Sequence, residues 1–343
     1  MATHAPELPP YRPPSEAGSI LIRVTRGCAW NRCTFCGMYK SERFSIRSLA
    51  EVEEDLEALK RALPGDIPST PGPAGARGRR RTPSGSSVFL GDSDCLVHPE
   101  LLAIVSAVRR TFPDAARITA YTRLHTLWRR APAYLRALRE AGLSRVHAGL
   151  ESGASEVLAR TCKGIDPARA IEGAQQARAA GFELSLYVLS GLGGEEGWEA
   201  HARESARVVA AAPPRFLRLR SLVVLPGTPL EELRHAQGFT PVSPLARLRE
   251  TRLLVAELAS RMSAQAAPAS EIELCSDHFS NYIWGDGELI YGGVNGYLPS
   301  DRDLLLAMLD ETLATATAKR KLVDPGSFAA RGRAPGLYGV AAL

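Results

Sequence analysis

The sequence is poor in cysteine and has no long apolar run. Its 343 residues include six cysteines, and three of these lie within nine positions of one another. Cysteines so few and so unevenly spaced exclude a disulfide scaffold. No apolar stretch is long enough to span a bilayer, and the first ten residues lack the basic region and apolar run of a signal peptide. We therefore expect a globular, cytoplasmic protein with no membrane partner.

A strong excess of one charge is also missing. The net charge is +5, and the stretch 64–87, rich in Pro, Gly, Ser and Arg, supplies +3 of it. We interpret 64–87 as a disordered insertion and its arginines, Arg77 to Arg81, as a solvated patch. A general nucleic-acid surface is therefore not expected.

Three clustered cysteines are the most informative feature that is present. Cys28, Cys33 and Cys36 follow an expected strand at 19–24 with the spacing C-x4-C-x2-C. Thiolates are the ligands that iron–sulfur clusters and zinc select, and a closed zinc site would need a fourth ligand nearby. A [2Fe–2S] centre would need one of the distant cysteines, whereas three thiolates leave one iron of a [4Fe–4S] cluster open. The open iron favours a catalyst over an electron carrier.

The rest of the chain predicts an α/β fold. Strands alternate with helices, which argues for an incomplete (β/α)6 barrel of the TIM type at 18–232. A C-terminal α+β extension follows at 233–326, with an extended segment at 1–17 and a flexible tail at 327–343. The six strands are expected at 19–24, 88–90, 117–121, 145–150, 184–189 and 216–224. Helices are expected at 48–63, 99–112, 134–141 and 244–262, with another beginning at Asp166.

The cysteine loop and the order of elements after it resemble the radical S-adenosylmethionine (SAM) superfamily over residues 18 to 232. Phe35 lies between the last two cysteines as in that family, although the first gap is one residue longer than usual. The barrel resembles those of oxygen-independent coproporphyrinogen oxidases and methylthiotransferases. The resemblance implies a single [4Fe–4S] cluster on Cys28, Cys33 and Cys36, whose open iron binds SAM. It also implies an external one-electron reductant of the flavodoxin or ferredoxin type.

The same resemblance implies SAM contacts at the carboxyl ends of the strands. Glu151, in the run Leu-Glu-Ser-Gly, would accept hydrogen bonds from the SAM ribose, whereas Lys163 is expected to be solvated and His147 to be a core or wall residue. The other implied cofactor contacts are Phe35, Gly91, Asp92, Asp94, Ser190, Gly191 and Pro226.

A substrate site is expected in the C-terminal extension. Cys275, His278, Asn281 and Tyr282 place a thiol, an imidazole, an amide and a phenol within eight residues, and His278 would carry a proton during turnover. With about 18 residues before the barrel, no room is expected for a cobalamin domain, and the remaining cysteines are too few for a second cluster. We therefore expect an oxidoreductase-like enzyme acting on a small or medium-sized molecule. An iron–sulfur electron-transfer protein and an RNA-modifying radical SAM enzyme remain the alternatives.

Overall fold

The computed structural model describes residues 5–62, 87–264 and 270–329. The expected insertion at 64–87 lies outside the described residues except for Ser87, and most of the expected tail at 327–343 does as well. Among the described helices, none combines the length and the apolar character needed to cross a bilayer.

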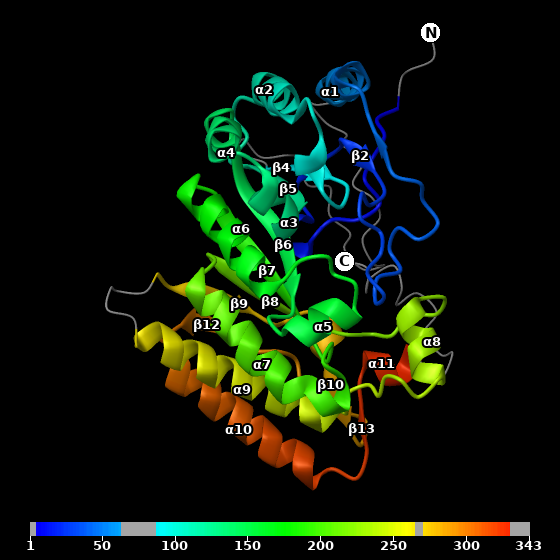
Figure 1. The fold of residues 1–343 in the computed structure, drawn as a ribbon, viewed down its shortest axis with the longest axis vertical. Coiled ribbons are helices and arrows are strands. Elements are labelled where there is room, and N and C mark those ends of the chain that lie inside the picture. Colours follow the sequence, from blue (N-terminus) through cyan, green and yellow to red (C-terminus); the bar gives the residue numbers. More distant parts are fainter. Residues whose placement is uncertain (1–4, 63–86, 265–269, 330–343) are drawn as a thin grey trace.

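A mostly parallel sheet of eight strands forms the centre of the molecule (Figure 1). Seven strands pair in parallel in the order β1-β4-β5-β6-β7-β8-β9, and β12 pairs antiparallel with β9. Within the described residues β1 and β12 end the row, so the barrel is open between them, as predicted for an incomplete TIM-type barrel. The bounds are β1 Ile20–Arg23, β4 Val88–Gly91, β5 Ile118–Arg123, β6 Leu143–Glu151, β7 Glu183–Ser190, β8 Phe216–Ser221, β9 Ile272–Cys275 and β12 Asn295–Leu298.

Helices follow the strands along the chain, and local capping explains where several begin. Ser48 accepts a hydrogen bond from the N–H of Glu51, whose carboxylate accepts one from the N–H of Ser48. Asp166 accepts one from the N–H of Arg169 in the same way. The bounds are α1 Leu49–Ala62, α2 Leu101–Thr111, α3 Leu124–Arg129, α4 Pro132–Glu140, α5 Ser155–Arg160, α6 Pro167–Ala179, α7 Gly194–Ala211 and α8 Pro229–His235.

The C-terminal extension lengthens the central sheet, which the sequence did not predict. Strands β9 and β12 have four residues each, too few for a clear alternation of apolar side chains. Helix α9 packs beside α7, α10 packs on α9, and both cover this end of the sheet (Figure 1). The remaining bounds are α9 Pro244–Ser263, α10 Arg302–Ala318 and α11 Pro325–Ala329, the small sheet β10 Ile283–Gly285, β11 Glu288–Tyr291 and β13 Leu322–Val323, the pair β2 Thr25–Arg26 and β3 Ser45–Ile46, and the 3-10 turns at Pro14–Glu16, Cys95–Val97 and Phe279–Asn281.

The barrel strands present different chemistry on their two faces. On β7, Leu184, Leu186 and Val188 belong to the main hydrophobic core, while Tyr187 between them lines a cavity. Successive side chains of a strand point to opposite faces, so one face packs on the helices and the other faces the barrel interior. The interior face carries the polar side chains that form the candidate site.

The N-terminal segment crosses the barrel interior. Glu7 forms ion pairs with Arg23 at the carboxyl end of β1 and with Arg26 on β2. Farther along the segment, the buried Glu16 lies 3.3 Å from Nε2 of His147 on β6. The segment therefore reaches from the rim of the first strand to the middle of the fourth strand in the row.

Candidate active site

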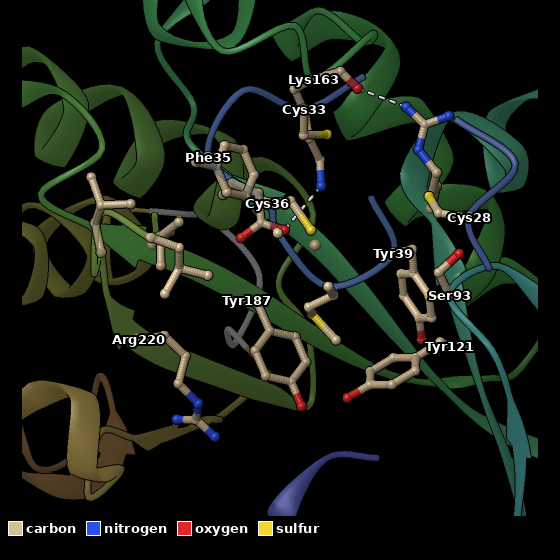
Figure 2. Close-up of a pocket in the computed structure, with 18 of the residues that line it drawn as sticks. Cys28, Cys33, Phe35, Cys36, Tyr39, Ser93, Tyr121, Lys163, Tyr187 and Arg220 are labelled. Atoms are coloured by element: carbon tan, nitrogen blue, oxygen red, sulfur yellow. Dashed lines mark hydrogen bonds and ion pairs between the residues drawn. The ribbon is translucent and has the colours of Figure 1, made fainter. Parts of the chain in front are cut away.

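The three clustered cysteines line one cavity at the carboxyl ends of the barrel strands. Cys28, Cys33 and Cys36 lie on the loop between β2 and β3 and are partly buried. The cavity has a volume of about 290 Å³, and all three thiols are on its wall together with Phe35 (Figure 2). Burial raises the pKa of Cys36 to about 11 and also raises the pKa of Cys33. Thiolates at these positions therefore need a cationic centre to stabilise them.

The three thiols line the wall of one cavity. Sulfurs that share one zinc ion, each at about 2.3 Å from it, lie roughly 4 Å from one another. Among the described residues, no three Cys, His, Asp or Glu side chains converge closely enough to hold a single ion. The three thiols nevertheless share one cavity, so the loop is a candidate for binding a metal centre.

Hydrogen bonds fix the cysteine loop to the turn between α5 and α6. The indole N–H of Trp30 donates to the carbonyl oxygen of Cys162 at 2.7 Å, and the N–H of Thr34 donates to that of Thr161 at 3.0 Å. Gly164 in this turn has φ +75°, and a Cβ there would lie 2.4 Å from the Trp30 ring. The loop position therefore depends on a glycine more than 130 residues away in the sequence.

Glu151 and Lys163 form an ion pair on the cavity wall. The Lys163 Nζ lies 2.9 Å from Glu151 Oε1, and a dashed line from the labelled Lys163 marks an interaction of its ammonium group in Figure 2. Gly149 leaves room for this pair, because a Cβ there would lie 1.9 Å from Glu151 Oε1. Burial lowers the pKa of Lys163, but the charges of Glu151 and Cys33 and the hydrogen bond to Glu151 together more than offset this, so the pKa ends above its ordinary value. The expectation that Lys163 is solvated was wrong, because this side chain is buried against its partner.

The opposite end of the cavity carries phenols and an arginine. Tyr121, Tyr187 and Arg220 lie there (Figure 2), on β5, β7 and β8, and His147 of β6 is also on the wall. The Tyr187 hydroxyl is buried and has no hydrogen-bond partner among the described residues. Sequence reasoning missed these residues, apart from His147, although each is a polar residue on the interior face of a strand whose other face is apolar.

A family model of the radical SAM superfamily matches residues 76–204. Over this range the chain is similar to the radical SAM superfamily. The matched range runs from before β4 into α7, so it contains Glu151 and Lys163 and leaves out the cysteine loop. Among curated proteins, none matches this chain.

Solved structures with similar folds include several radical SAM proteins. The cobalamin-dependent SAM radical enzyme OxsB, with SAM bound, gives a TM-score of 0.50 at 13% identity, over 74% of this chain and 44% of that one. The radical SAM methyltransferase TsrM from Kitasatospora setae, with cobalamin and a [4Fe–4S] cluster bound, gives 0.47 at 21%, over 64% and 37%. Methylornithine synthase PylB gives 0.43 at 16%, over 85% and 79%. This chain spans less than half the length of the first two.

Several residues predicted to contact SAM in a radical SAM enzyme lie behind the cavity wall. The Asp92 carboxylate accepts from the N–H of Gly27 at 2.8 Å and from Arg23, and Asp94 accepts from the hydroxyls of Thr122 and Thr126. Both carboxylates are buried, and neither they nor Gly91 line the cavity, whereas Ser93 does. The acids of this strand end therefore hold the cysteine loop and β5 in place.

The predicted residues after β7 and β8 lie outside the cavity lining as well. The N–H of Gly191 donates to both oxygens of Glu250, and Ser190 accepts the N–H of Leu222 through its carbonyl. Pro226 lines a separate hollow beside α9. The cavity wall between these points is apolar and is formed by Leu189, Leu222, Val223 and Leu225.

Of the four predicted substrate residues, His278 lines the cavity. Asn281 is buried, and its amide bonds to the Ser221 hydroxyl and to the carbonyl oxygens of Leu219 and Ser276. Tyr282 packs against other aromatic rings of the extension, and Cys275 lies on β9 outside the lining. Asn281 therefore joins the extension to β8 and holds His278 in position.

Proposed function

We propose that this protein is a radical SAM enzyme in which Cys28, Cys33 and Cys36 hold a [4Fe–4S] cluster. The observation that carries the proposal is that the three thiols and the Glu151–Lys163 pair line the same cavity. When bound, the reduced cluster supplies one electron that splits SAM into methionine and a 5′-deoxyadenosyl radical, which takes hydrogen from the substrate.

Glu151 is the proposed acceptor for the ribose hydroxyls of SAM. Its Oε1 is bonded to Lys163, which fixes the carboxylate, and its Oε2 forms no hydrogen bond with the described residues. Glu151 has φ +66°, a left-handed conformation that is unusual for a residue with a side chain. Because strained backbone of this kind gathers at ligand sites, the conformation supports a binding role.

The apolar wall is the proposed place for the adenine ring. Phe35 and Leu225 lie on this wall near the cysteines, and the leucines of β7 and the β8 end continue it. Such a surface excludes water from the reacting atoms. Ser190, Gly191 and Pro226 would then support this wall, while His278 and the phenols face the substrate.

The proposed reductant and the proposed substrate class are supported by the exposure of the cysteines and by the size of the cavity. The cysteines are partly exposed, so an external one-electron donor of the flavodoxin or ferredoxin type can approach them. The cavity volume of about 290 Å³ suits a small molecule beside SAM better than a folded RNA. We propose a small-molecule substrate.

Anaerobic reconstitution tests the proposal. We expect about four irons per chain in the wild type, loss of iron in Cys33→Ser, and unchanged iron in Cys162→Ser, whose side chain is exposed and off the cavity wall. The reduced wild type should convert SAM to 5′-deoxyadenosine. Two irons per chain, or four irons with no cleavage of SAM, would favour the electron-transfer alternative. Tight, salt-sensitive tRNA binding would favour the RNA-modifying one.

A further inference from the structure

The end of the cavity opposite the cysteines, which we call the deep end, is lined by Tyr121, Tyr187 and Arg220. It carries hydrogen-bond donors and no unpaired carboxylate among the described residues. Of the described residues that line the cavity, Glu151 is the one carboxylate, and Lys163 already pairs with it. Arg123 and Arg220 line the same cavity and form no ion pair with a described residue. The cavity wall therefore carries three cations against one anion.

Arg220 is the cation at the deep end. Its guanidinium donates to the carbonyl oxygen of Leu219 and lies 5.6 Å from the centre of the Tyr187 ring (Figure 2). Burial lowers the pKa of Arg220, and Asp277, which raises it, is exposed and forms no ion pair with it. A largely buried guanidinium without a carboxylate carries an unmet desolvation cost.

His278 adds a second donor from the extension. The N–H of Ser280 donates to Nδ1 of His278 at 3.1 Å, so Nδ1 is the acceptor of a neutral ring. The ring proton then lies on Nε2, which has no partner among the described residues. Burial and the charge of Arg220 lower the pKa of His278 to about 3, which agrees with a neutral ring. His278 therefore offers an N–H to the cavity.

Tyr187 is the third donor. Its buried hydroxyl has no hydrogen-bond partner among the described residues, and Tyr121 lines the same end of the cavity (Figure 2). The one carboxylate near the floor, Glu16, is bonded to His147 and to the Ser19 hydroxyl. The floor therefore has no unpaired carboxylate to accept from the Tyr187 hydroxyl, and its acceptor without a partner among the described residues is the neutral Nδ1 of His147.

We propose that the substrate carries a carboxylate, which binds Arg220 with the Tyr187 hydroxyl and the His278 Nε2–H as further donors. This inference rests on the proposed radical SAM function and names the class of substrate for the same cavity. One planar guanidinium matches the two oxygens of a carboxylate, whereas phosphate sites commonly gather several cations or a helix N-terminus. The carboxylate at the deep end leaves the rest of the substrate facing the cysteine end, where SAM is expected.

Simple acids test the site without knowledge of the full substrate. The reconstituted protein with SAM bound is titrated with succinate, with its neutral diamide succinamide, and with inorganic phosphate, and binding is followed by ligand-observed NMR. We expect succinate to bind at least tenfold more tightly than either of the other two. Arg220→Gln should remove the preference for the acid, a loss of about 10- to 100-fold for a charged hydrogen-bonded pair. Arg136→Gln, an exposed arginine on α4 that lies off the cavity, should change nothing.

A second variant covers the case in which Arg220→Gln does not fold. Tyr187→Phe keeps the ring and removes one neutral donor, so succinate should bind about 2- to 10-fold more weakly. The proposal would be overturned if the wild type bound succinate no more tightly than succinamide, or if Arg220→Gln bound succinate as tightly as the wild type. If Arg220→Gln does not fold, unchanged succinate binding in Tyr187→Phe would overturn it. Tighter binding of phosphate than succinate, or weaker SAM binding with unchanged succinate binding in Arg220→Gln, would overturn it too. Iron content and 5′-deoxyadenosine formation in the wild type report separately on the radical SAM function.

Discussion

Gly164 and Gly227 offer a matched pair of substitutions that measures how firmly the cysteine loop is docked. Both glycines have φ +75°. A Cβ at Gly164 would lie 2.4 Å from the Trp30 ring, whereas a Cβ at Gly227 would have no atom within 4 Å. Gly164→Ala therefore combines a strained backbone with a clash, and Gly227→Ala has the strain alone.

The contacts of Trp30 set the expected difference. Both variants carry the left-handed conformation of alanine, which costs roughly 1 to 2 kcal/mol. Gly164→Ala also displaces Trp30, which loses its hydrogen bond to Cys162, worth about 0.5 to 1.5 kcal/mol. The ring also loses the guanidinium groups of Arg123 at 4.8 Å and Arg32 at 5.1 Å, each worth about 0.5 to 1 kcal/mol. Gly164→Ala should therefore destabilise the protein by about 1.5 to 3.5 kcal/mol more than Gly227→Ala.

Two measurements check this expectation. Urea unfolding of the metal-free proteins gives the difference in the free energy of unfolding between the variants. Chelator-driven loss of iron from the reconstituted proteins should be faster in Gly164→Ala than in Gly227→Ala. Equal destabilisation and equal iron loss in the two variants would refute the view that Trp30 anchors the loop.

Two further predictions concern the carboxylates of Glu151 and Glu250. Gly149→Ala would place a Cβ 1.9 Å from Glu151 Oε1, so it should displace this carboxylate and weaken SAM binding about 10- to 100-fold in equilibrium dialysis while iron content stays unchanged. Burial raises the pKa of Glu250 to about 8 and lowers that of His201, 3.1 Å away, to about 4. Wild-type stability should therefore fall by up to about 2 kcal/mol between pH 6.5 and 8, and Glu250→Gln should remove this fall in urea unfolding.

The sign of the pH effect follows from proton counts. Between pH 4.5 and 8 the folded state keeps a proton on Glu250 that the unfolded state has lost, so stability decreases as pH rises. Between pH 4 and 6.5 the unfolded state binds a proton on His201 that the folded state does not, so this group acts in the opposite direction. The net fall is thus expected above pH 6.5, and a flat wild-type profile there would contradict it. Glu140→Gln, at an exposed glutamate, is the control.

Gly197→Ala is the control for Gly149→Ala. Gly197 lies within α7, and a Cβ added there would have no atom within 4 Å. Gly197→Ala should therefore leave SAM binding unchanged while stabilising the helix by about 1 kcal/mol. If Gly149→Ala binds SAM as tightly as Gly197→Ala does, the Glu151–Lys163 pair has no part in the SAM site.

The barrel was predictable where local signals are strong. The capping boundary at Ser48 and the cap at Asp166 are encoded by residues close in sequence, and the structure has both. The cysteine loop was recognisable because its three cysteines are also close in sequence. Its docking was not, because the contact between Trp30 and Gly164 joins segments that are distant along the chain.

The polar interior of the barrel was harder to predict for a different reason. A strand such as β7 reads as apolar because its outward face carries three core residues, and Tyr187 between them looks like one more hydrophobic residue. Arg220 on β8 has no sequence neighbour that marks it as a ligand-binding residue. Its proposed role depends on the absence of a carboxylate partner among the described residues. That absence is visible in the folded barrel and cannot be read from the sequence.

The N-terminal segment explains how a polar floor is tolerated beneath the site. Glu16 is fully buried, and its carboxylate accepts from the Ser19 hydroxyl and lies 3.3 Å from Nε2 of His147. Burial lowers the pKa of His147, so the ring stays neutral and its Nε2–H can donate to Glu16. The segment thus supplies the acceptor that His147 needs, and the donors of the cavity floor are left for a ligand. A Pro-rich segment that looked like a simple extension therefore sets which polar groups of the barrel interior remain available for binding.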